Sequence, residues 1–178
     1  MQSMSRIHSF PPIEAPDARI LILGSMPGKE SLQAAQYYAH GRNIFWNIME
    51  DLIGAKRDLP YESRIEIVKS AGIALWDVLA SCQRHGSMDA DIDATSISSN
   101  DLESFLLTHP HISYIFFNGA IAEKRFRLHM LSWRAPRPLH YQRLPSTSPA
   151  YASMPYQQKL SEWEAILRTG AAGQSNKK

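Results

Sequence analysis

The sequence predicts an α/β fold of three layers, in which a central, mostly parallel four-stranded sheet lies between two layers of helices. Short apolar runs alternate along the chain with longer segments whose apolar residues recur at helical spacing. This alternation is typical of parallel sheets, because consecutive parallel strands are joined by a crossover helix. The 178 residues, of which 44% are hydrophobic, suit one compact domain. We expect that domain to span residues 1–169, followed by a flexible polar tail over residues 170–178.

The first half of the chain is expected to form a strand, two helices and a second strand. Arg19–Leu23 reads RILIL, an apolar run that ends at Gly24 and is typical of a buried strand running into a loop. Asn43–Ile53 has its apolar residues at helical spacing, and Tyr61–Ala71 is a second helical segment that a glycine stops. Ile73–Trp76 is again short and apolar, which indicates a second buried strand.

The second half contributes a helix, a strand, a basic amphipathic helix, a strand and a closing helix: Asp101–Leu107, Ile112–Phe117, Ala120–Leu131, Leu139–Leu144 and Gln157–Arg168. Ser99 or Asn100 can cap the first of these helices, because both side chains accept hydrogen bonds from backbone N–H groups. Ligands of open parallel sheets bind beyond the carboxyl ends of the strands. The site is therefore expected in the loops that follow the strands: Gly24–Tyr38, Asp77–Ile92, Asn118–Gly119 and Pro145–Pro155.

The formal net charge is only +2, yet the cations are concentrated in one stretch. From Lys124 to Lys159 there are seven Lys and Arg residues and no Asp or Glu, whereas the rest of the chain holds 12 Lys/Arg against 17 Asp/Glu, a net of 12 − 17 = −5. Such polarity suits a polyanionic partner, although a solvated face without a partner fits the charges equally well. The aromatic and loop residues in the same stretch favour nucleic acid.

Several classes of protein are disfavoured by what the sequence lacks. A single cysteine, Cys82, excludes a disulfide framework, suits a reducing cytosol and is expected to be a small buried residue. No apolar run approaches the ~20 residues that span a bilayer, and Met1–Glu14 lacks a secretory pattern. The histidines do not show zinc-ligand spacing, so we expect neither a metal nor a cofactor.

The loop after the first strand, Gly24–Ser31, reads GSMPGKES. A P-loop has four residues between its glycines and Ser or Thr directly after its lysine, whereas this loop has three residues and places Glu30 after Lys29. A nucleoside triphosphatase is therefore disfavoured, and the absence of a Gly-x-Ser-x-Gly elbow argues against a small-molecule hydrolase. The Gly/Pro turn is either purely structural or brings backbone amides close to an anionic ligand.

The second segment, Tyr37–Trp46, reads YYAHGRNIFW. Aromatic rings beside His, Arg and Asn suit a pocket that stacks a planar base and supplies polar contacts. Phe45 and Trp46 can also lie partly in the core, since both stand at the start of a predicted helix. For Tyr38, His40 and Asn43 a functional role is at least as well supported as a structural one.

The third segment, Leu144–Ala150, reads LPSTSPA. Two prolines stiffen it, and its three hydroxyl groups can donate hydrogen bonds to phosphate oxygens. Its apolar tip could wedge into a base stack, as in proteins that kink DNA. A plain surface turn is the alternative, which the surrounding basic stretch makes the weaker interpretation.

Together, GSMPG, YYAHGRNIFW and LPSTSPAYA resemble the uracil-DNA glycosylase superfamily, most closely its hypoxanthine or deoxyinosine branch, family six. Ala39–Trp46 is also similar to the Ala-His-Pro-x-Asn-x-Phe-Trp segment of mismatch-specific uracil glycosylases, apart from Gly41 in place of proline. The resemblance covers roughly residues 7–167 in order of elements. It implies a uracil-DNA glycosylase-like fold and a monofunctional enzyme that hydrolyses the N-glycosidic bond of a deaminated base (hypoxanthine, uracil or xanthine) during base excision repair of damaged DNA.

The resemblance also implies roles for individual residues. Asn43 carries catalysis by positioning the attacking water, since Met26 stands where many members have Asp or Asn. Tyr38 is the aromatic residue that stacks on the flipped base. Leu144 stands where other branches have a histidine that stabilises the departing base anion, so that contribution is absent. The expected base pocket comprises Gly24, Ser25, Met26, Pro27, Tyr38, His40, Asp77 and Asn118.

Two of these pocket residues have alternative interpretations. Asp77 stands where other members read base edges, yet it could instead cap a helix. Asn118 could supply a pocket amide, although a turn-forming Asn-Gly pair explains it better. The expected DNA-binding residues are Arg137, Arg143, Ser146, Thr147, Ser148, Pro149 and Ala150.

The expected reaction is hydrolysis without a lyase step, because no lysine is a compelling nucleophile. We expect a monomer that binds DNA and no membrane, in the cytoplasm or, in a bacterium, at the nucleoid. A non-catalytic nucleic-acid-binding module on the same fold is the main alternative, consistent with apolar residues at positions 26 and 144.

Overall fold

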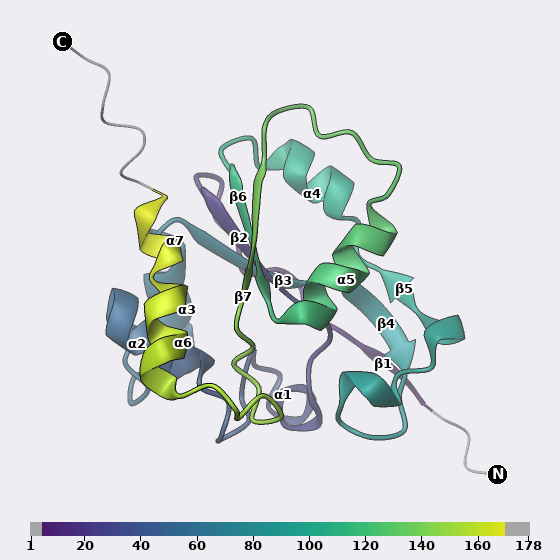
Figure 1. Cartoon of the computed structure of the whole chain (residues 1–178), viewed down its shortest axis with the longest axis horizontal. Coiled ribbons are helices and arrows are strands. Elements are labelled where there is room, and N and C mark those ends of the chain that lie inside the picture. Colours follow the sequence, from purple (N-terminus) through teal and green to yellow (C-terminus); the bar gives the residue numbers. More distant parts are fainter. Residues whose placement is uncertain (1–4, 170–178) are drawn as a thin grey trace.

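The computed structural model describes residues 5–169, so the predicted tail over residues 170–178 lies outside the described part of the chain. Its centre is a sheet of four parallel strands in the order β3-β2-β6-β7 (Figure 1). The strands are β2 (Ile20–Gly24), β3 (Ile73–Asp77), β6 (Tyr114–Asn118) and β7 (His140–Leu144). Each overlaps one of the four predicted strands, and the parallel four-stranded sheet is confirmed.

Helices cover both faces of this sheet, as Figure 1 shows. Along β2, Ile20 and Ile22 belong to one buried cluster, whereas Leu21 and Leu23 belong to another. The cluster around Leu21 is completed by α4 (Leu102–Thr108) and α5 (Ala120–His129). The opposite cluster is completed by α2 (Phe45–Ile53), α3 (Tyr61–Ser70), α6 (Tyr156–Trp163) and α7 (Ala165–Arg168). The predicted three-layer fold is therefore confirmed.

A second, antiparallel sheet was not predicted. It has the order β1-β4-β5, formed by β1 (Arg6–His8), β4 (Leu79–Gln83) and β5 (Ser98–Ser99). The segment expected to be the loop Asp77–Ile92 therefore contains a strand, which carries the buried Cys82. Two single-turn 3-10 helices, η1 (Asp89–Asp91) and η2 (Ala94–Ser96), follow it.

The helix ends differ from the predictions in two places. Asp101, not Ser99 or Asn100, caps α4, because its side chain accepts a hydrogen bond from the Ser104 N–H. The Asn100 side chain instead donates to the carbonyl oxygens that end β3 and begin β4. The predicted closing helix is divided at Glu164 into α6 and α7. Within residues 5–169, no helix is long and apolar enough to cross a membrane.

Candidate active site

The carboxyl ends of the four parallel strands bring the sequence motifs to one edge of the sheet. Gly24 is in register with Asp77 on one neighbouring strand, and Asn118 is in register with Leu144 on the other side. The short helix α1 (Lys29–Ala34) and the loop Leu144–Ala150 follow at the same edge. Three segments that are far apart in the sequence therefore meet where ligands of parallel sheets bind.

Gly24, Asp77 and Tyr38 lie in close contact at this edge. A Cβ atom built on Gly24 would lie 2.4 Å from Asp77 Oδ1 and 3.2 Å from Tyr38 Oη. No real Cβ atom approaches an oxygen that closely, so only glycine lets the carboxyl group and the phenol take these positions. Tyr38 itself has a φ of 56°, a left-handed conformation that non-glycine residues adopt rarely and often at functional sites.

The Tyr38 ring stacks on Phe45, with 4.0 Å between the ring centroids and 22° between the planes. Phe45 therefore covers one face of the ring expected to stack on a base, and a base can only meet its other face or its edge. Burial first, and then the charge of Asp77, raise the pKa of the Tyr38 phenol, whereas a hydrogen bond with the Asn118 side chain lowers it. The phenol is a neutral donor at every physiological pH.

Asn43 lies at the start of α2, where its side chain has a structural partner. Its Oδ1 accepts the Phe45 N–H at 3.0 Å, and its own N–H donates to the His40 carbonyl oxygen. An amide oxygen has two lone pairs, so Oδ1 can hold the helix end and still accept a hydrogen bond from a water molecule. The hydrogen bond from the Phe45 N–H fixes the orientation of the Asn43 side chain. A residue that positions water needs such a fixed orientation.

His40 and Glu30 link the second motif to α1. The His40 Nδ1 accepts the Arg42 N–H at 3.0 Å, and its Nε2 lies 3.9 Å from Glu30 Oε1. The imidazole is therefore oriented on both sides, with Nε2 turned toward the first motif.

Asn118 is used as a clamp on the loop Leu144–Ala150. Its Oδ1 accepts the Thr147 N–H and its Nδ2 donates to Thr147 Oγ1, at 3.0 and 2.9 Å. The Thr147 carbonyl oxygen in turn accepts the N–H of Ile44, next to Asn43. Asn118 therefore both contacts Tyr38 and fixes the loop, while Gly119 at φ 92° makes the turn that follows.

The closing helix α6 holds the same loop from the other side. The ammonium group of Lys159 donates to the carbonyl oxygens of Ser146 and Tyr151, and the indole N–H of Trp163 donates to the Pro145 carbonyl oxygen at 2.9 Å. Lys159 is only 3% exposed, and burial lowers the pKa of its ammonium group. Lys159 is the last cation of the basic stretch in the sequence, but its side chain is buried and holds the loop Leu144–Ala150 in place.

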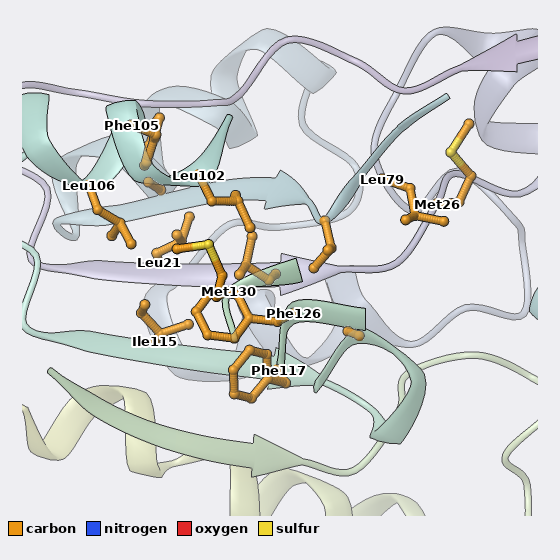
Figure 2. Close-up of a cluster of buried hydrophobic side chains, with 14 of the residues drawn as sticks. Leu21, Met26, Leu79, Leu102, Phe105, Leu106, Ile115, Phe117, Phe126 and Met130 are labelled. Carbon is orange, nitrogen blue, oxygen red and sulfur yellow. The ribbon is translucent and has the colours of Figure 1, made fainter. Parts of the chain in front are cut away.

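Met26 packs into the core beside Leu79, as Figure 2 shows. Its side chain is buried, so the first motif presents backbone and not the Met26 thioether to the site. Pro27 is also buried, and its carbonyl oxygen accepts a hydrogen bond from Arg84 at 2.8 Å.

Asp89, which the sequence did not single out, reaches the first motif from η1. The Ser25 hydroxyl group donates to the Asp89 carboxylate, with 2.8 Å to either oxygen. The segment Gln83–Ile92 thereby folds over the Gly24–Pro27 loop. Burial raises the pKa of Asp89, which the Ser25 hydrogen bond partly offsets. The sequence carried no usable signal, because Asp89 follows the unpredicted strand β4 in a run of small polar residues.

Asp77 is the last residue of β3 and is only 4% exposed. The strand β4 follows it, so the alternative that Asp77 caps a helix is wrong. Its Oδ2 has no hydrogen-bond partner among the described residues. Burial, and then the charge of Asp89, raise the pKa of Asp77 to about 7.

The two arginines expected to bind DNA lie in different surroundings. Arg143 forms an ion pair with Glu123, which also holds Arg127 at 2.8 Å, so this acid directly before the basic stretch offsets part of its charge. Arg137 lies at the opposite edge of the sheet, where its guanidinium group donates to the carbonyl oxygens of Leu106, His109 and Ile112. The structure therefore does not bring Arg137 to the loop.

The remaining hydroxyl groups of the loop have local partners. Ser146 Oγ accepts the Ser148 N–H, and Ser148 Oγ accepts the Ala150 N–H. Each hydroxyl group can still donate its own proton. Pro149 is partly exposed and Ala150 exposed at the loop tip, whereas Thr147 is buried. Among residues 5–169, no group of three or more His, Cys, Asp or Glu side chains could hold a metal ion.

The model of one protein family, described as the uracil DNA glycosylase superfamily, matches residues 11–168. The chain belongs to the uracil DNA glycosylase superfamily. The resemblance of the three motifs is thereby confirmed, and the family match spans all four strands of the parallel sheet.

Two relatives and one solved structure are similar to this chain over much of its length. A hypoxanthine DNA glycosylase of Methanosarcina acetivorans is 35% identical over 162 residues, which are 89% of this chain and 96% of that protein. A hypoxanthine DNA glycosylase of Methanosarcina barkeri is 35% identical over 114 residues, 62% of this chain and 69% of that protein. A solution NMR structure of a candidate uracil DNA glycosylase from Methanosarcina acetivorans has a TM-score of 0.75 and 32% identity, covering 92% of this chain and 98% of its own.

Proposed function

We propose that this chain is a monofunctional DNA glycosylase that hydrolyses the bond between deoxyribose and hypoxanthine, with uracil and xanthine as further substrates. The observation that carries the proposal is the close approach of Asp77 and Tyr38 at Gly24, with Asn43 joined to the Tyr38 ring through Phe45, in a chain of this superfamily. The two relatives named hypoxanthine DNA glycosylase favour an enzyme over a non-catalytic binding module.

The target nucleotide first leaves the duplex, at a cost of a few kcal/mol that is smaller for a poorly paired base. The hydroxyl groups of Ser146 and Ser148 donate to phosphate oxygens, and the tip Pro149–Ala150 fills the gap in the stack. Asn118, Lys159 and Trp163 stiffen this loop from below, so little order has to be gained on binding.

Bond cleavage leaves an oxocarbenium-like sugar and a base anion. Asn43 Oδ1 accepts a hydrogen bond from the attacking water and so directs the water oxygen toward the sugar. Orientation of the water is sufficient, because a cationic sugar does not need a strong base for attack. Backbone N–H groups of the Ser25–Met26 turn donate toward the departing base. Lys159 is buried against carbonyl oxygens and is not placed to attack the sugar, so no lyase step follows.

The test is base release from oligonucleotides that contain one deoxyinosine, deoxyuridine or deoxyxanthosine, in single and double strands. Strand breaks should form only after alkali treatment, which separates a monofunctional glycosylase from a lyase. Asn43→Ala should slow single-turnover release at least about 100-fold while duplex binding persists. Asn47→Ala, on the same helix α2, is the matched control. Release by Asn43→Ala at the wild-type rate would sink the assignment of Asn43.

The proposal includes a monomer that works in the cytoplasm on chromosomal DNA. Sedimentation of the protein with and without a deoxyinosine duplex tests this part.

A further inference from the structure

Arg84 has a guanidinium nitrogen that no hydrogen bond uses. The residue directly follows β4, and its Nη2 and Nε donate to the carbonyl oxygens of Pro27 and Gly86, at 2.8 and 3.0 Å. Its Nη1 is buried and has no hydrogen-bond partner within residues 5–169. Buried side-chain donors nearly always have an acceptor. Because the other two nitrogens already fix the guanidinium group, Nη1 is a preoriented donor without an acceptor.

A cavity of about 290 Å³ lies beside this guanidinium group, near the lower end of the size of ligand sites. Its walls come from β1, from α1 and from the segment after β4: Ile7, Lys29, Leu32, Gln33, Arg84 and Gly86. Lys29 and Gln33 are exposed, so their side chains can move and admit a ligand atom to the shielded Nη1. The cavity therefore suits a small ligand.

The cavity has two cations without a counterion. Neither Lys29 nor Arg84 forms an ion pair in the part of the chain that the structure describes. No acid is among the residues that line the cavity. The acids nearby each have another partner: Ser25 for Asp89, Met88 for Asp91 and His40 for Glu30. The two cations are therefore left for an anionic ligand.

A phosphate group matches these donors. A guanidinium group offers planar N–H donors to phosphate oxygens, and an ammonium group adds a compact positive charge. The Gln33 amide can donate a further hydrogen bond. The apolar side chains of Ile7 and Leu32 suit the sugar that carries the phosphate. A nucleotide of a DNA strand presents both parts together.

The cavity lies on the other side of the base pocket from the loop Leu144–Ala150. Arg84 follows β4, which continues from β3, whereas the loop follows β7, and β3 and β7 are the two edge strands of the parallel sheet. The hydrogen bond from Arg84 to Pro27 joins the cavity to the first motif. A strand that is held on one side only can let a flipped nucleotide return to the stack, and a second hold on the other side opposes that return.

We propose that Lys29 and Arg84 bind a phosphate group of the DNA strand, on the side of the base pocket away from the loop Leu144–Ala150. Arg84 Nη1 donates to one phosphate oxygen and the Lys29 ammonium group donates to another. This inference rests on the proposed function and adds a second hold on its substrate. Neither residue belongs to the basic stretch from Lys124 to Lys159, so the DNA-binding surface extends beyond it.

The first experiment measures binding to a duplex with a tetrahydrofuran abasic site, which the enzyme cannot hydrolyse, over a salt series. Lys29→Gln and Arg84→Gln should each reduce the slope of log K against log salt by about one, and the double variant by about two. Lys56→Gln, at an exposed lysine beyond the carboxyl end of α2, is the matched control and should keep the wild-type slope. Wild-type slopes in both single variants would overturn the proposal.

The second experiment locates the phosphate by replacing one phosphate of the abasic strand at a time with an uncharged methylphosphonate. Wild type should lose about tenfold in affinity at each contacted position. At one of these positions Lys29→Gln and Arg84→Gln should lose much less, because their contact is already absent. Losses equal to those of wild type at every position would overturn the proposal.

Two controls keep the result decisive. Arg84→Gln also removes two hydrogen bonds to backbone carbonyl oxygens, so its folding is checked by urea titration. Lys29→Gln keeps the test valid if that variant fails to fold, because the Lys29 side chain is exposed. Inorganic phosphate is the probe for a free anion. Phosphate that shifts the Arg84 side-chain signals in NMR spectra, with no methylphosphonate position depending on Lys29, would assign the cavity to a free anion and overturn the DNA contact.

These measurements separate this inference from the proposed function, because they record binding and not catalysis. Failure to release a base from any oligonucleotide would overturn the proposed function and leave the slopes and the methylphosphonate scan to be judged by themselves. Base release together with unchanged slopes and an unchanged scan would overturn the second phosphate site alone.

Discussion

Asn118 and Thr147 hold each other by two hydrogen bonds, one from the Thr147 N–H to Asn118 Oδ1 and one from Asn118 Nδ2 to Thr147 Oγ1. Thr147 is 1% exposed and also accepts the N–H of Ile44. The end of β6 thereby fixes the distance between the loop Leu144–Ala150 and the segment that carries Asn43. In the proposed mechanism, the contact of this loop with DNA and the alignment of the water by Asn43 are therefore linked through Thr147.

We predict that Thr147→Val lowers both stability and base release. The valine keeps the shape but leaves the buried Asn118 N–H without its acceptor, which costs about 1–3 kcal/mol of unfolding free energy. Urea titration and single-turnover release measure the two effects. Thr108→Val, at the exposed end of α4, is the control and should change neither. Wild-type stability and rate in Thr147→Val would show that the clamp is dispensable.

Arg143 and Arg137 should respond differently to removal. Arg143→Ala should weaken duplex binding for every sequence and reduce the slope of log K against log salt by about one, as expected for a lost phosphate contact. Arg137→Ala should leave that slope unchanged but lower the unfolding free energy, because three carbonyl oxygens lose their donor. Filter binding over a salt series, together with urea titration, separates the two. A reduced slope in Arg137→Ala would return that residue to the DNA-binding surface.

Glu123→Gln should strengthen DNA binding at low salt. In the wild type, Glu123 forms ion pairs with Arg127 and Arg143. The neutral glutamine side chain removes both ion pairs, so the two arginines become free to contact DNA phosphates. The gain should shrink as salt is added, because surface charges are screened over about 10 Å at 0.1 M. Glu103→Gln, an exposed acid on α4, is the control for the change in net charge alone. Equal gains in both variants would rule out a specific release of the two arginines.

Asp89→Asn should lower the pKa of Asp77. The charge of Asp89 is the second cause of the raised value, after burial, and the amide removes it while keeping an acceptor for Ser25. The titration of the Asp77 carboxyl carbon, followed by NMR, should therefore move to lower pH. Asp58→Asn, an exposed acid in the loop before α3, should leave it in place. An unmoved Asp77 titration in Asp89→Asn would mean that the two carboxyl groups do not interact.

Gly24→Ala should lower the rate of base release strongly and lower the unfolding free energy only modestly. The added Cβ atom would meet Asp77 Oδ1 at 2.4 Å, so the carboxyl group or the strand end must move. Overpacking of this kind costs about 1–3 kcal/mol. Gly28→Ala is the matched control, since a Cβ atom there meets nothing within 4 Å. Single-turnover release in the two variants decides the outcome, and equal rates would contradict a need for close approach at Gly24.

The parallel sheet could be predicted because β2, β3 and β6 each coincide with a local apolar run that ends near turn residues, such as Arg19–Leu23 before Gly24. The small antiparallel sheet could not, because Arg6–His8 pairs with a strand more than seventy residues away and neither has a strong pattern of its own. Its β5 has only two residues.

The candidate site was predictable where a residue stands at the carboxyl end of a strand, as Gly24, Asp77 and Asn118 do. The site was not predictable where the hydrogen-bond partners of a side chain, which only the structure shows, decide what that side chain does. Lys159 and Arg137 look like surface cations in the sequence, yet both donate hydrogen bonds to backbone carbonyl oxygens. Asp89 reaches Ser25 only because the unpredicted strand β4 turns the chain back toward the first motif.

The anchoring of the loop by Lys159 and Trp163 sets an order for events during synthesis. The four strands of the parallel sheet and the motif around Asn43 precede α6 in the chain, so they are synthesised before it. Until then the loop Leu144–Ala150 lacks the hydrogen bonds from Lys159 and Trp163. A nascent chain that ends before α6 would therefore have the parallel sheet and the segment around Asn43, but a loosely held loop Leu144–Ala150.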